Sequence, residues 1–123
     1  MDGLEYEQFC AKYIENKGFT SVIVTDSGGD QGVDVIGYKD GEKYAFQCKY
    51  YEGSVGNKAV QEVFSGARFY DCTKAVVITN SKFTNSAREL AYKIGVAKTI
   101  KAACEKEKQA YGQWKESCSK QFR

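Results

Sequence analysis

The chain has 123 residues, 42% hydrophobic and 28% charged, with a formal net charge of +2. This length and composition predict one folded domain with its own core. The absence of histidine excludes a serine–histidine triad, a histidine general base and the common histidine-containing zinc sites. No run approaches the ~20 apolar residues of a membrane span, and acidic residues closely follow Met1, so we expect neither a membrane segment nor a signal peptide.

Hydrophobic spacing predicts the elements of the first half of the chain. Residues 3–17 carry an apolar stripe at helical spacing, which Gly18 ends, and residues 21–25 form a β-branched strand. A loop with three glycines follows at 26–32. Residues 33–38 and 42–51 then form two strands, and the Asp40-Gly41 dipeptide between them indicates a β-hairpin.

The second half continues with a helix from Asn57, whose side chain is expected to cap it, a buried strand at 75–79 and a helix at 84–94. The order α-β-β-β-α-β-α predicts an α/β sandwich with a mixed central sheet and helices on both sides. We expect residues 1–95 to form this domain. Residues 96–123 have apolar positions at spacings near three and four, and predict a helical extension that packs on the domain or on a second subunit.

The five cysteines lie outside any CxxC motif, and their number is odd. This usage is typical of small buried hydrophobic residues in a reducing compartment rather than of a metal or redox site, so we expect a cytoplasmic protein. The residues are Cys10, Cys48, Cys72, Cys104 and Cys118.

The predicted hairpin brings three polar side chains together. A two-residue turn at Asp40-Gly41 places Asp34 opposite Gln47, and strand alternation puts Asp34, Gln47 and Lys49 on one face. Val35, Phe46 and Cys48 point to the other face and can fill a core. An ordinary exposed face with a weak surface ion pair is the alternative. A functional cluster is favoured because the polar residues occupy one end only, beside the glycine-rich loop.

Four sequence blocks in order carry a resemblance: GDQGVDV, QCKYY, VGNKAVQEVFSGARFY and AVVITNSKFTNSARELA. Together they resemble the Mrr-type restriction endonuclease domain of the PD-(D/E)xK nuclease superfamily, over about residues 3–95. The resemblance implies a restriction-endonuclease-like α/β/α sandwich and a metal-dependent DNA endonuclease. Relatives usually follow the equivalent of residues 94–96 with a short apolar strand, where this chain predicts helix.

The resemblance implies a role for each residue of the cluster. Asp34 matches the first metal-binding acid, Gln47 stands where most of the superfamily has Asp or Glu, and Lys49 matches the catalytic lysine. Glu7, at the edge of the first helix's apolar stripe, matches a glutamate of related junction resolvases. Asp34, Gln47, Glu7 and the Cys48 carbonyl would hold Mg²⁺, with Mn²⁺ as a substitute and no small-molecule cofactor. Because Gln47 is uncharged, replacing it by Glu should tighten Mg²⁺ binding.

DNA is the expected partner, and two-fold DNA favours a homodimer. The residues expected to contact DNA are Asp30, Gln31, Lys58, Gln61, Asn80 and Ser81. Three alternatives stay open: a Holliday-junction resolvase, a DNA-binding or assembly module with the nuclease fold, and a nuclease subunit that a partner chain activates.

Overall fold

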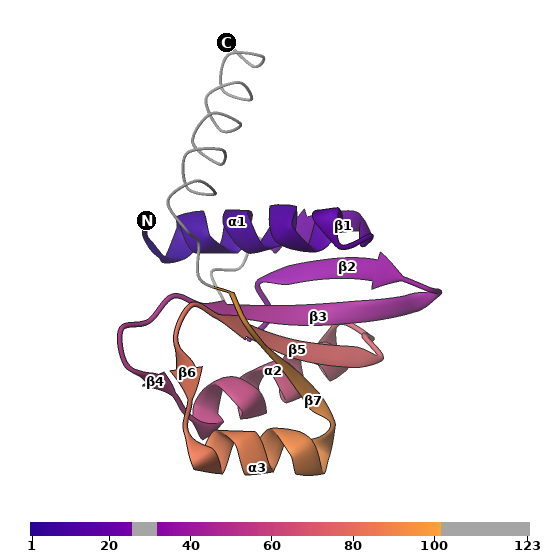
Figure 1. Cartoon of the computed structure of the whole chain (residues 1–123). Coiled ribbons are helices and arrows are strands. Elements are labelled where there is room, and N and C mark those ends of the chain that lie inside the picture. The colour runs from indigo at the N-terminus through magenta and orange to yellow at the C-terminus, as the bar shows by residue number, and fades with distance from the viewer. Residues whose placement is uncertain (26–31, 102–123) are drawn as a thin grey trace.

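The core of the molecule is a five-stranded sheet with the order β1-β2-β3-β5-β7. A computed structural model, which describes residues 1–25 and 32–101, places helix α1 on one face of the sheet and helices α2 and α3 on the other (Figure 1). Strands β1, β2 and β3 are antiparallel, whereas β5 runs parallel to β3 and β7 parallel to β5. The predicted α/β/α sandwich with a mixed sheet is therefore confirmed. The elements are α1 Gly3–Asn16, β1 Thr20–Val24, β2 Val35–Lys39, β3 Glu42–Lys49, β4 Ser54–Val55, α2 Asn57–Phe69, β5 Lys74–Thr79, β6 Lys82–Phe83, α3 Asn85–Ile94 and β7 Val96–Ile100.

Helix α1 closes one of the two hydrophobic cores. Asp2 caps the helix, since its Oδ1 accepts a hydrogen bond of 2.8 Å from Glu5 N. The apolar stripe of the helix packs against side chains from β2, β3 and β5, which removes this area from water. The buried residues of this core are Tyr6, Phe9, Cys10, Ala11, Ile14, Val35, Phe46, Cys48, Val76 and Ile78.

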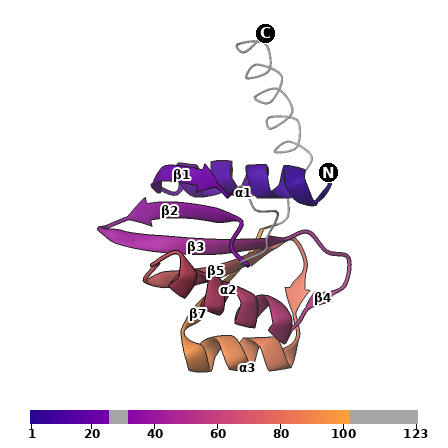
Figure 2. The ribbon, with the colours of Figure 1, turned by 180° about the vertical axis from the view of Figure 1, so that it is seen from behind.

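Helices α2 and α3 cover the second core on the opposite face, as the view from behind also shows (Figure 2). Helix α2 begins at Asn57 after Gly56, the N-cap residue, and its start has no side-chain cap, so the expected cap by Asn57 is wrong. Helix α3 is capped by Thr84, whose Oγ1 accepts from Ala87 N at 3.0 Å. It ends at Gly95, whose φ of 76° favours glycine.

The β2–β3 hairpin has the predicted register. Lys39 pairs with Glu42 and Val35 with Phe46. Asp40 and Gly41 have φ values of 53° and 77°, the left-handed pair that a two-residue turn between twisted strands needs. The turn thereby fixes which residues meet at the far end of the hairpin.

Strand β7 corrects the helix expected from residue 96. Val96–Ile100 pairs in parallel with β5, from Ala75↔Val96 to Thr79↔Ile100, and extends the sheet past residue 95. The β-branched Val96, Thr99 and Ile100 favour this strand, and their helical spacing was misleading over so short a segment. The remainder of the expected helix, 102–123, lies outside the described residues.

A second small sheet pairs β4 with β6 in parallel, in two segments for which the sequence predicted no strand. Both strands follow the ends of longer strands, β4 after β3 and β6 after β5. In the described ranges, no helix has the length and apolar character needed to cross a bilayer.

Candidate active site

Asp34 is held by the main chain of the hairpin. It directly precedes β2, and its N–H donates to Phe46 O at 2.8 Å while its Oδ2 accepts from Cys48 N at 2.7 Å. The residue is 8% exposed. Both hydrogen bonds follow from the hairpin register, so the turn that sets this register also places the acid.

Gln47 lies between Phe46 and Cys48 on β3 and is buried, at 3% exposure. Its Nε2 donates to Oε2 of Glu62 on helix α2 at 2.8 Å. Its Oε1 is buried and has no hydrogen-bond partner in the part of the chain that the structure describes. The side chain therefore presents an unsatisfied acceptor oxygen, which is unusual in a folded protein.

Glu62 was missed in the sequence reading. Its neighbours on the helix surface, Ala59 and Gly66, are both buried, which places position 62 at the edge of the buried stripe. Glu7 has the same kind of position, at the edge of the apolar stripe of its helix, so this signal could have identified Glu62 as well.

Glu7 approaches the site from helix α1, on the other face of the sheet. Burial, the charge of Asp34 and a side-chain hydrogen bond with Asp34 raise the pKa of Glu7 to about 7. Burial also raises the pKa of Asp34, while the Cys48 amide, the hydrogen bond with Glu7 and the charge of Lys49 oppose that rise. The two carboxyls thus share a proton more readily than they both ionise.

Lys49 ends β3, and its backbone is held by the residues that end β5. Thr79 Oγ1 donates to Lys49 O at 2.7 Å. Asn80 binds both polar groups of the Tyr51 main chain, with Oδ1 accepting from Tyr51 N at 2.7 Å and Nδ2 donating to Tyr51 O at 2.9 Å. Ser81 Oγ donates to Gly53 O at 2.6 Å. We call Thr79, Asn80 and Ser81 the carbonyl clamp.

The residues expected to contact DNA lie in three different settings. Asn80 and Ser81 belong to the carbonyl clamp, so their side chains already bind main-chain groups. Lys58 and Gln61 are exposed on α2, and Lys58 lines a cavity of about 100 Å³ together with Lys49. Asp30 and Gln31 lie outside the described residues.

The donor set fits a divalent cation that prefers oxygen. In the described ranges, no cluster of three or more Asp, Glu, Cys or His side chains is arranged around a metal. Glu7 and Asp34 offer carboxylates, and the unpartnered Oε1 of Gln47 offers a neutral oxygen, as does the Cys48 carbonyl. Mg²⁺ typically binds few carboxylates and retains several waters, which suits this set.

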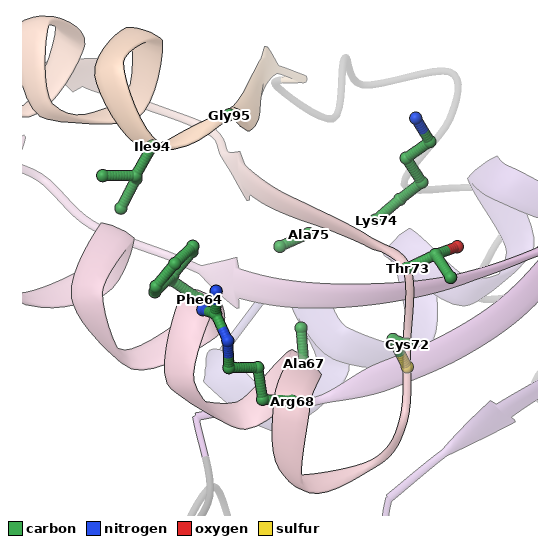
Figure 3. Close-up of a pocket in the computed structure, with 9 residues that line it drawn as sticks. All are labelled: Phe64, Ala67, Arg68, Cys72, Thr73, Lys74, Ala75, Ile94 and Gly95. Atoms are coloured by element: carbon green, nitrogen blue, oxygen red, sulfur yellow. The ribbon is translucent and has the colours of Figure 1, made fainter.

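A larger cavity, of about 190 Å³, lies at the opposite end of β5 (Figure 3). The Arg68 guanidinium there lies 3.8 Å from the ring centroid of Phe64. Its lining includes Cys72 and Lys74 but no carboxylate, so it lacks the ligands of a hard cation.

A mixed sheet between helix layers, with an acid, an amide and a lysine at one end of a central hairpin, defines a restriction-endonuclease-like nuclease domain. The comparisons with known families agree. Residues 1–106 match the family model Mrr_cat, described as restriction endonuclease. The chain therefore belongs to the Mrr_cat restriction endonuclease family, as the sequence resemblance indicated.

Two relatives are longer than this chain. It is 32% identical over 105 residues to an uncharacterized protein of Archaeoglobus fulgidus, covering 79% of this chain and 60% of that protein. The crystal structure of AF1548, a protein of unknown function, superposes with a TM-score of 0.70 at 24% identity, covering 86% of this chain and 62% of that one. The chain thus spans about three fifths of the length of both.

Two restriction endonucleases share the fold. The DNA modification-dependent enzyme AspBHI has a TM-score of 0.59 at 21% identity, covering 76% of this chain and 27% of that enzyme. MspJI, solved in complex with a 27-mer oligonucleotide, has a TM-score of 0.54 at 22% identity, covering 78% and 24%. At these identities the likeness concerns the fold.

Proposed function

We propose that this chain is a metal-dependent DNA endonuclease of Mrr type that hydrolyses phosphodiester bonds with Mg²⁺ or Mn²⁺. The observation that carries the proposal is that the buried Asp34 carboxylate and a buried Gln47 Oε1, which has no hydrogen-bond partner among the described residues, lie at the same end of the hairpin. Two oxygen ligands at one end of a hairpin, with Lys49 two residues further on, are the groups such hydrolysis requires.

Each residue contributes a separate function. Asp34, Gln47, the Cys48 carbonyl and Glu7 would hold the cation, which when bound neutralises phosphate charge and lowers the pKa of a coordinated water. The Lys49 ammonium orients the attacking water or stabilises the negative charge that develops on the phosphate oxygens. The carbonyl clamp holds the Lys49 main chain, so this lysine is positioned before DNA binds.

DNA would be bound mainly through its phosphates. Lys58 and Gln61 are exposed on α2, and the small cavity that Lys58 and Lys49 line lies at the start of that helix. A related fold was solved with an oligonucleotide in MspJI. Backbone binding predicts an affinity that falls steeply with salt. A homodimer would bring two sites to the two strands, and light scattering on the purified chain tests this assembly.

The test is nicking of supercoiled plasmid with Mg²⁺ or Mn²⁺ by the parent chain and by Lys49→Ala. Lys39→Ala, at the turn end of the same hairpin, is the matched control. We expect metal-dependent nicking by the parent and by Lys39→Ala, and its loss in Lys49→Ala. Equal nicking by all three contradicts the site. No nicking by any of them, with DNA binding intact, favours a binding module or a subunit that a partner activates.

A junction resolvase is the second candidate, because Glu7 meets Asp34 from the first helix as the resemblance to resolvases implies. Cleavage of a four-way junction is compared with cleavage of a linear duplex of the same sequence. Paired symmetric nicks in the junction at a much higher rate would favour the resolvase. Comparable rates on the two substrates favour the Mrr-type endonuclease.

A further inference from the structure

The contact between Gln47 and Glu62 joins β3, the central strand of the sheet, to helix α2. Gln47 Nε2 donates to Glu62 Oε2 at 2.8 Å, and Gln47 also pairs with Val77 of the buried strand β5. The other carboxylate oxygen of Glu62 lies 3.8 Å from Lys58 Nζ, whose side chain is 89% exposed. The exposed lysine interacts weakly, so the short hydrogen bond to Gln47 is the stronger contact of this carboxylate.

This hydrogen bond selects one of the two orientations of the Gln47 amide. An amide has a donor end and an acceptor end, whereas a carboxylate only accepts. Rotating the amide by 180° would place Oε1 against the Glu62 carboxylate, with two acceptors facing each other and no proton between them. Glu62 therefore holds Nε2 and leaves Oε1 as the free atom, which is the buried oxygen that has no partner.

The main chain before Asp34 packs against the same turn of α2. A Cβ added at Gly32 would lie 2.6 Å from Glu62 O and 2.8 Å from Glu62 Cβ, and the φ of Gly32 is +71°. Only glycine fits this close approach without displacement. Glu62 is thus the residue of helix α2 that contacts both the Gln47 side chain and Gly32, in the segment that leads into Asp34.

We propose that Glu62 is a positioning residue of the metal site, which fixes the Gln47 amide with Oε1 toward the cation and supplies, one hydrogen bond away, the negative charge that Gln47 lacks. The inference rests on the proposed function. Partners of this kind typically change metal affinity by about 10- to 100-fold. The site would thereby contain the negative charge that an acidic ligand brings, supplied by Glu62, although its ligand atom, Gln47 Oε1, belongs to a neutral amide.

The test measures Mn²⁺ affinity of the full chain by titration calorimetry, without DNA. The variants are Glu62→Gln, the double variant Gln47→Glu with Glu62→Gln, and the control Glu15→Gln, an exposed glutamate near the end of α1. We expect Glu62→Gln to weaken Mn²⁺ binding by about 10-fold or more. Glu15→Gln should bind like the parent. The double variant exchanges the acid and the amide between the two positions and should restore the affinity.

Thermal unfolding of each metal-free variant checks that the fold is retained. Weaker binding in Glu62→Gln together with recovery in the double variant supports the proposal, because a merely structural defect would not be reversed by a new acid at position 47. Unchanged affinity in Glu62→Gln overturns it, and so does a failure of the double variant to recover. If the parent itself binds no Mn²⁺, the proposed metal site is wrong and this inference fails with it. If the parent binds Mn²⁺ and Glu62→Gln binds it with the same affinity, only this inference is rejected.

Discussion

The register of strand β3 is set by a local turn at one end, whereas at the other end the main chain of Lys49 and the residues after it is held by side chains at and just after the end of β5. Thr73 and Tyr70 also contact Glu42 and Lys43 at the turn end, but the register there follows from the Asp40-Gly41 dihedral angles and the Lys39↔Glu42 pair. These are local features, and they depend on residues adjacent in sequence.

The other end depends on residues about 30 positions away. Thr79, Asn80 and Ser81 hold the main-chain groups of alternate residues, Lys49, Tyr51 and Gly53, which continues the β3–β5 pairing beyond the last strand residues. We therefore expect stability and positioning to be separable in this strand. Substitutions at the turn should affect folding alone, whereas substitutions at the site end should also affect chemistry.

The largest effect is expected for Asp34→Asn at the site end. The new amide oxygen can still accept the hydrogen bond from Cys48 N, so the hairpin should fold. Loss of the carboxylate should lower the rate of metal-dependent plasmid nicking by at least about 10²-fold, with little change in the thermal unfolding midpoint. Nicking at the parent rate would show that Asp34 is no part of the site.

Asn80→Ala tests whether the carbonyl clamp positions Lys49 or Asn80 contacts DNA. The variant loses both hydrogen bonds to Tyr51, which should lower the free energy of unfolding by about 1–2 kcal/mol. The nicking rate should fall by more than the loss of folded protein explains. The salt dependence of DNA binding should stay that of the parent. A reduced salt dependence would instead identify Asn80 as part of the phosphate-binding surface.

Gly41→Ala is the matched control at the turn end. Its φ of 77° makes any side chain strained there, which should cost about 1 kcal/mol. Nicking per folded molecule should stay at the parent level. If Gly41→Ala and Asn80→Ala lose nicking equally, the two ends of β3 are not separable.

The Glu7 carboxyl should make the stability of the metal-free protein depend on pH. Its pKa is raised to about 7, above an ordinary value of about 4.3, so the folded state binds more protons than the unfolded state between these values. The free energy of unfolding should therefore fall as pH rises from about 4.5 to 7. Urea unfolding in the presence of a chelator measures this free energy at each pH. The Glu7→Gln variant should show a smaller decline with rising pH than the parent. Identical pH profiles for parent and variant would contradict the Glu7–Asp34 contact.

The hairpin and the two faces of the sheet could be predicted from sequence because they follow from local rules. The Asp40-Gly41 turn sets the register, and alternation then assigns Val35 and Phe46 to the α1 core. Apart from the short strands β4 and β6, the order of helices and strands up to residue 94 followed in the same way from hydrophobic spacing. The C-terminal strand did not, because five residues with apolar positions at both ends fit a helix and a strand equally well.

The contacts within the site were beyond local rules. The position of Glu62 beside Gln47 depends on how α2 packs on β3, and Asn80 meets Tyr51 only because β5 lies beside β3. The sequence predicted the residue types of the candidate site but not which carboxylate each polar group meets. Those pairings arise from tertiary packing and determine the orientation of the Gln47 amide.

The most direct test of the central claim is the anomalous scattering of Mn²⁺ in a crystal of the parent chain soaked with that ion. We expect one peak within direct coordination distance of an Asp34 carboxylate oxygen and of Gln47 Oε1, with Gln47 Nε2 still bound to Glu62. A peak elsewhere, or none at a concentration that supports nicking, would contradict the assignment of these residues as the metal site.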